Sequence, residues 1–135
     1  MAIEATFYLT YPEAVEIHIR LMRRWNEVRY GVDNKDLIAS ALARPQQAAF
    51  YENADLPRQA ATLCYGLVKN HPWVGGNKRT ATVLMQTFLV KNGWQVNAAR
   101  NEWLEMVLRV EADRWKVAEI KVWLRQHTIK IEENR

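Results

Sequence analysis

Apolar residues recur along most of the chain at intervals of three and four positions, the spacing that places them on one side of an α-helix. The first stripe follows Thr10, which forms a capping box with Glu13, and Gly31 is expected to end the helix. The stripe comprises Ala14, Val15, His18, Leu21, Met22, Trp25 and Val28. We therefore expect a helix over residues 11–30, with a hydrogen-bonded His18 inside the core.

A shorter second helix is expected after this one. Asp33 or Asn34 can cap it, and it should run through Ala43, because Pro45 disfavours helical continuation. Residues 46–51 then show neither a helical period nor a pair of turn signals. We expect them to form a small extended flap.

Four further helices are expected, over residues 55–70, 77–92, 98–112 and 116–126. The helix over 77–92 is apolar on most of its faces and should therefore be the central, buried one. The polar tail from residue 129 is expected to fray. Since the chain has no repeat, linker or low-complexity segment, we expect a single all-α domain over residues 1–135, with about six helices and the flap.

Composition fits one compact domain in a reducing compartment. The chain has 135 residues, 49% of them hydrophobic, including six tryptophans. Its one cysteine, Cys64, lies among apolar neighbours and is expected to be a buried thiol. The chain start does not resemble a signal peptide, and no apolar run approaches the ~20 residues of a membrane span. We therefore expect a cytoplasmic protein.

The charge balance narrows the class of partner. The net charge is only +4, and the basic residues are dispersed along the chain. This pattern fits a phosphate-bearing ligand or an acidic protein partner, and it argues against nucleic acid, which favours clustered basic residues.

One connector between two expected helices has an unusual composition, His71-Pro-Trp-Val-Gly-Gly-Asn-Lys-Arg-Thr80. Gly75 and Gly76 come just before a helix start, where free backbone amides favour an anion. Lys78 and Arg79 oppose the helix dipole there, at a cost of about 0.3–1 kcal/mol each. That placement makes sense if the two cations bind a phosphate.

Two other residues of this connector could serve a ligand. Asn77 is suited to cap the helix and to orient a bound group, and His71 is the side chain suited to general-base work near neutral pH. From the residues alone, a glycine-rich connector with solvated cations remains an equally good interpretation. A Walker A loop is excluded, because Asn77 separates Gly76 from Lys78 and a helix precedes the segment.

The connector resembles the signature of the Fic/Doc family, His-Pro-Phe-x-Asp/Glu-Gly-Asn-x-Arg. The matching positions are His71, Pro72, the aromatic Trp73, Gly76, Asn77 and Arg79. Position 78, directly after the asparagine, separates two branches of the family. Fic-type nucleotidyltransferases usually carry glycine there, and Doc-type toxins carry lysine. Lys78 therefore favours the Doc branch.

The resemblance implies a compact helical Fic fold and a toxin held inactive by an antitoxin protein. It also implies transfer of phosphate from ATP to a hydroxyl of a translation factor of the elongation factor Tu type, or alternatively transfer of AMP. His71 would be the base, with Arg79 also catalytic. The implied phosphate-binding residues are Gly76, Asn77, Lys78 and Arg79, and the implied target-docking flap consists of Gln47, Ala48, Ala49 and Phe50.

One position departs from the family pattern. The acidic residue that helps to hold Mg²⁺ falls at position 75, where this chain has Gly75. Three interpretations stay open: Mg²⁺ is held by phosphates and another residue, the enzyme is weak, or the chain keeps the fold and binds a nucleotide or partner without catalysis.

Overall fold

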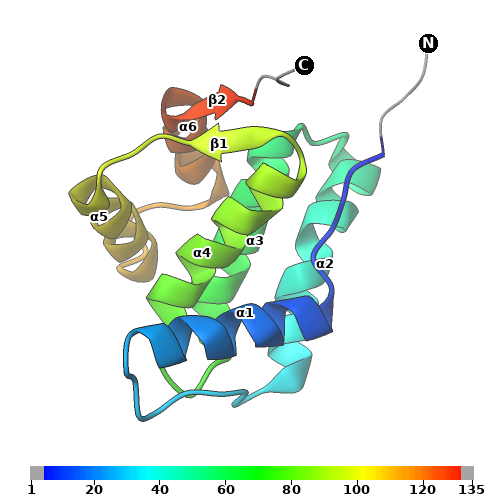
Figure 1. Cartoon of the computed structure of the whole chain (residues 1–135). Helices are drawn as coiled ribbons and strands as arrows, with labels where there is room; N and C mark the ends of the chain where they lie inside the picture. The colour runs from blue at the N-terminus through cyan, green and yellow to red at the C-terminus, as the bar shows by residue number, and fades with distance from the viewer. Residues whose placement is uncertain (1–4, 132–135) are drawn as a thin grey trace.

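The computed structural model describes residues 5–131 and, within them, contains six helices and one pair of short strands (Figure 1). In chain order they are α1 (Tyr11–Arg24), α2 (Lys35–Glu52), α3 (Leu56–Asn70), α4 (Asn77–Lys91), β1 (Trp94–Val96), α5 (Arg100–Glu111), α6 (Val117–His127) and β2 (Thr128–Lys130). The expected all-α class is confirmed. No helix among these residues combines the length and the apolar composition needed to cross a membrane.

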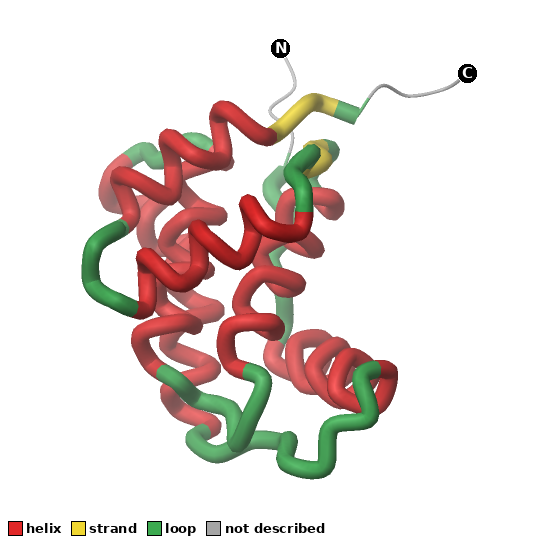
Figure 2. Tube along the Cα trace, turned by 90° about the vertical axis from the view of Figure 1, so that its left-hand side faces the viewer, coloured by secondary structure: helices red, strands yellow, loops and turns green. Residues whose placement is uncertain are grey.

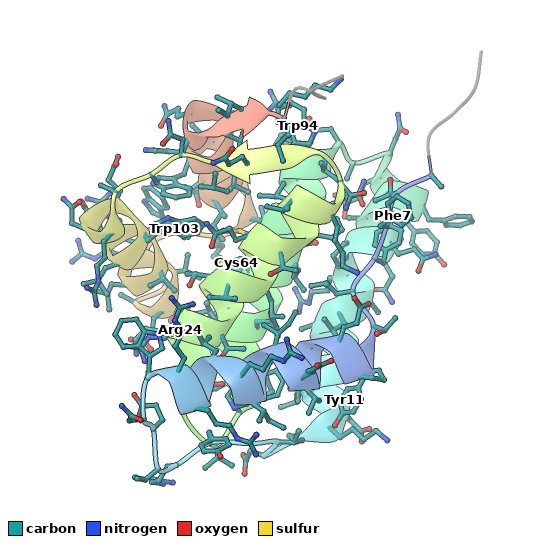
Figure 3. The ribbon with its side chains drawn as sticks, viewed as in Figure 1. Phe7, Tyr11, Arg24, Cys64, Trp94 and Trp103 are labelled. Carbon is teal, nitrogen blue, oxygen red and sulfur yellow. The ribbon has the colours of Figure 1, made fainter. Side chains whose placement is uncertain are left out.

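Helices α3 and α4 form the centre of the fold (Figure 1). A central position was expected for α4 from its apolar faces. α3 lies beside α4 and packs against α2, α4, α5 and α6. Cys64 of α3 is fully buried in this core (Figure 3), and burial raises the pKa of its thiol to about 12. The expected core role of Cys64 is therefore confirmed.

Helix α1 begins as expected but ends earlier. The capping box of Thr10 is present, whereas the helix stops at Arg24 instead of continuing to Gly31. Asn26 adopts a left-handed conformation, with φ of 55°. The N–H of Glu27 then donates to the carbonyl of Met22 at 2.9 Å, which closes the helix end.

This early end changes the environment of two residues. Trp25 and Val28, expected on the buried stripe, are 45% and 92% exposed, because they lie in the connector over 25–34 rather than on a helix. Trp25 becomes available to a ligand at the protein surface.

The expected extended flap is wrong. Helix α2 continues through Pro45 to Glu52, so residues 46–51 are helical. A proline inside a helix costs about 3 kcal/mol. Here the ring of Pro45 is buried, and α2 makes its most extensive contacts with α3, so tertiary packing outweighs the local preference. The expected flap residues are Gln47, Ala48, Ala49 and Phe50, and all lie on the last turns of this helix.

The expected fraying of the tail is wrong for its first residues. Strand β2 pairs antiparallel with β1, with Gln95 opposite Ile129, and this pair covers one end of the bundle (Figure 1). Residues 132–135 of the expected tail lie outside the described residues.

Two connectors run side by side at the other end of the bundle (Figure 2). They are the α1–α2 connector over 25–34 and the α3–α4 connector over 71–76. The N–H groups of Asp33 and Asn34 both donate to the carbonyl of Pro72 at 3.0 Å, and the N–H of Val74 donates to the carbonyl of Gly31 at 2.9 Å. The first connector therefore supports the one that carries the family-like motif.

His18 joins these connectors to the helices. Its ring is fully buried and stacks on Trp73 with ring centres 4.1 Å apart. Because the N–H of Gly31 donates to Nε2 at 3.0 Å, the ring proton lies on Nδ1, which contacts the Thr80 hydroxyl at 2.8 Å. The expected core role of His18 is confirmed. Burial lowers the pKa of His18 from 6.5 to about 4.

This pKa shift predicts a stability that depends on pH. Below pH 6.5 the unfolded state takes up a proton at His18, whereas the folded state does so only near pH 4. The contribution is therefore present above pH 6.5 and is lost as the pH falls toward 4, by up to about 3 kcal/mol. Urea unfolding at pH 7 and at pH 4.5 measures it. A His18→Asn variant should lose this component of the pH dependence, and an unchanged dependence in that variant would contradict the assignment.

Candidate active site

A cleft of about 810 Å³ opens between the end of α1, the 71–76 connector, the first turns of α4 and helix α5. This volume lies in the range of small-molecule sites. Figure 3 shows Trp103 of α5 between that helix and the central helices, and Trp103 forms part of the apolar wall. Among the described residues that line the cleft, three are cations and none is Asp or Glu; the cations are Lys78, Arg79 and Arg100.

The start of α4 faces this cleft without a side-chain cap. Gly76 is the capping residue, with φ of 69°, and it has no side chain that could accept from the first amides. A Cβ at position 76 would also lie 2.5 Å from Sδ of the buried Met22. The positive φ favours glycine here, and a side chain would also displace the end of Met22. The open helix start can receive an anion.

Asn77 is the first residue of α4 rather than its cap, and its side chain closes the connector. Its Oδ1 accepts from the N–H of Trp73 and its Nδ2 donates to the Trp73 carbonyl, both at 2.9 Å. The same Nδ2 lies 3.4 Å from Nδ1 of His71. The amide thus fixes the connector and weakly orients His71, while its backbone N–H remains at the helix start.

His71 ends α3 in a left-handed conformation, with φ of 49°. This backbone geometry lets the chain leave the helix at once, and the exposed imidazole lines the cleft beside Gly75 and Gly76. A histidine at this place can take a proton from a hydroxyl that enters the cleft.

Two of the cations are held by carboxylates outside the lining. Lys78 pairs with Glu111 at 3.0 Å, and Arg79 pairs with Glu27 at 3.3 Å. The guanidinium of Arg79 also lies 4.4 Å from the centre of the Trp25 ring. Because all four charged side chains are partly exposed, these ion pairs are weak, and an anionic ligand can replace them.

Gly75 lies in close contact with the neighbouring connector. A Cβ at this position would lie 2.5 Å from the carbonyl oxygen of Arg29, which is backbone and cannot turn away. An acidic side chain therefore does not fit here unless the connector moves. Residues 5–131 also contain no cluster of three His, Cys, Asp or Glu side chains suited to a metal. The cleft residues thus do not fit a metal site of their own.

The structure brings the motif together and separates it from the expected flap. His71, Gly76, Asn77, Lys78 and Arg79 all line the cleft. None of the flap residues does so, and Gln47 and Ala48 instead line a separate polar hollow between α2 and α3.

Sequence reasoning missed the part of the cleft lining that lies outside the motif. Trp25, Arg100 and Trp103 line the cleft together with the motif, although they belong to distant segments. No local pattern in the sequence indicates that these three residues lie close together. The helical spacing places Trp25 on the buried stripe of the first helix instead.

Comparison with known proteins agrees with the geometry. The model of the Fic/DOC family matches residues 8–89, which is more than half of the chain. The chain therefore belongs to the Fic/Doc family. It is also 45% identical over 65 residues to the protein named Toxin Doc of Mycolicibacterium smegmatis. This match covers 46% of the chain and 49% of the relative, so the chain matches about half the length of that protein.

The close contact at Gly75 predicts that an acidic residue introduced at position 75 destabilises the fold. Gly75→Asp should lower the free energy of unfolding by about 1–3 kcal/mol, since it overpacks the contact with the Arg29 carbonyl. Gly75→Ala is the matched control, because it adds the Cβ without the charge and should cost a similar amount. Denaturant unfolding measures both. A Gly75→Asp protein as stable as the unmodified chain would contradict the steric argument.

Proposed function

We propose that this chain is a Doc-type toxin that transfers the γ-phosphate of ATP to a hydroxyl of a protein target. The observation that carries the proposal is the cleft itself, in which an uncapped helix start, three cations and a histidine converge. Membership of the Fic/Doc family and the resemblance to a protein named Toxin Doc support the same function.

In this proposal the backbone amides at the start of α4 and the side chains of Lys78 and Arg79 bind the phosphates of ATP. His71 accepts the proton of the target hydroxyl. The hydroxyl oxygen forms a bond to the γ-phosphorus, the bond from that phosphorus to the bridging oxygen breaks, and ADP leaves with the electron pair. The protein contributes position and positive charge rather than a covalent intermediate.

Positive charge in this cleft comes from side chains. The lining has no carboxylate, and an acidic residue at position 75 would not fit without movement of the connector. The proposed transfer therefore relies on side-chain cations rather than on a metal held by the cleft residues. The cations at Lys78 and Arg79 neutralise charge on the phosphates as the bond to ADP breaks.

The same lack of an acid favours a second candidate function, in which the chain binds a nucleotide or a partner without catalysis. Transfer of AMP in the manner of Fic-type enzymes is the other alternative. Lys78 supports γ-phosphate transfer over AMP transfer, because lysine follows the asparagine in the Doc branch.

The proposal includes two protein partners. One is an antitoxin that keeps the toxin inactive, in line with the name of the relative. The other is a cytoplasmic translation factor of the elongation factor Tu type, whose modification would arrest growth. Helical residues 46–51 lie outside the cleft, so the target is not expected to dock on them as an extended flap.

Growth arrest tests the proposal in cells. Induced expression of the chain in a bacterium without the antitoxin should stop growth, and His71→Ala should relieve the arrest, because loss of a general base lowers rates by about 10²–10⁴-fold. Arg79→Ala should also relieve it. Culture density and viable counts measure the effect.

The matched control is Arg109→Ala. Arg109 lies on α5 outside the cleft, where it pairs with Glu105 and stacks over Trp115. This variant should remain toxic. Full toxicity of both His71→Ala and Arg79→Ala would show that the cleft chemistry is not the cause of the arrest.

A further inference from the structure

Arg100 reaches the cleft from helix α5, whereas the motif residues come from the 71–76 connector and α4. It is the first residue of α5, and its side chain lines the cleft together with His71 and Arg79. A cation in the first turn of a helix is opposed by the helix dipole, and the residue is exposed to solvent. Nothing in the helix itself therefore favours an arginine at this position.

Among residues 5–131, Arg100 is the cation of the cleft lining that forms no ion pair with a carboxylate. Lys78 and Arg79 are paired with Glu111 and Glu27, respectively. The positive charge of Arg100 is thus uncompensated inside a concave surface that contains no Asp or Glu. Such a surface concentrates anions.

The side chain of Trp25 contacts both Arg100 and Arg79. The guanidinium carbons of the two arginines lie 5.5 Å and 4.4 Å from the centre of the Trp25 ring. The ring attracts both cations and limits their positions. The two guanidinium carbons therefore lie no more than about 10 Å apart, and both side chains line the cleft, so one ligand with several linked anionic groups can contact both.

We propose that Arg100 is a second phosphate-binding arginine of the cleft, which holds the same polyphosphate chain as Arg79. This inference rests on the proposed function, which supplies a nucleoside triphosphate as the ligand. A guanidinium offers two parallel N–H donors that match the oxygens of a phosphate. Arg100 thereby adds positive charge from α5, in a cleft whose lining has no carboxylate to hold a metal.

Calorimetric titration of the purified full-length chain with ATP, and separately with inorganic tripolyphosphate, tests this role at fixed ionic strength. Arg100→Ala should weaken the binding of both anions by about tenfold, the size expected for a lost charge-assisted hydrogen bond. Arg109→Ala is the matched control, since it removes the same charge from the same helix outside the cleft, and it should bind as the unmodified chain does.

The outcomes separate this inference from the proposed function. If Arg100→Ala binds both anions like the unmodified chain while Arg79→Ala binds them weakly, the role of Arg100 is wrong and the proposed function stands. If Arg100→Ala and Arg109→Ala weaken binding equally, the effect is one of net charge, and the site-specific role is overturned. If the unmodified chain binds neither anion, the proposed function fails together with the inference.

A second measurement covers the part played by Trp25. Trp25→Ala should weaken ATP binding, whereas Trp25→Phe, which keeps an aromatic face for both guanidinium groups, should largely restore it. Equal affinities for the two variants would show that the ring does not position the arginines.

Discussion

The stack of neutral His18 on Trp73 is the contact on which the site depends. The His18 ring accepts a hydrogen bond from the Gly31 N–H, contacts the hydroxyl of Thr80 and stacks on Trp73. This one side chain of α1 therefore contacts both connectors and α4. The ring can accept from Gly31 only when it is uncharged, because a protonated Nε2 could not accept the Gly31 N–H. Burial lowers the pKa of His18 and so favours the neutral form that makes this contact.

The close fit of the two connectors also determines the electrostatics of the cleft. The Arg29 carbonyl leaves room for glycine at position 75, and the cleft lining consequently lacks the family's acid. The lining instead carries cations from α4 and from α5. The proposed phosphoryl transfer would draw its positive charge from side chains of both helices, and two of these side chains contact Trp25.

Elements with local signals could be predicted from the sequence. The capping residue Thr10, the core roles of His18 and Cys64, and the position of the motif at the start of α4 are as expected. The continuation of α2 through Pro45 could not be predicted, because packing on α3 decides it. The convergence of Trp25 and Arg100 on the motif likewise depends on tertiary structure, since no periodicity relates such distant positions.

The proposed reaction in this cleft is transfer of the γ-phosphate of ATP to a protein hydroxyl. The most direct measurement is incubation of the purified chain with elongation factor Tu or cell lysate and with ATP labelled at either the γ or the α position. We expect label on a protein from γ-labelled ATP and none from α-labelled ATP, with the transfer lost in His71→Ala. Label from α-labelled ATP would instead show AMP transfer, and no label from either would show binding without catalysis; both results would rule out γ-phosphate transfer.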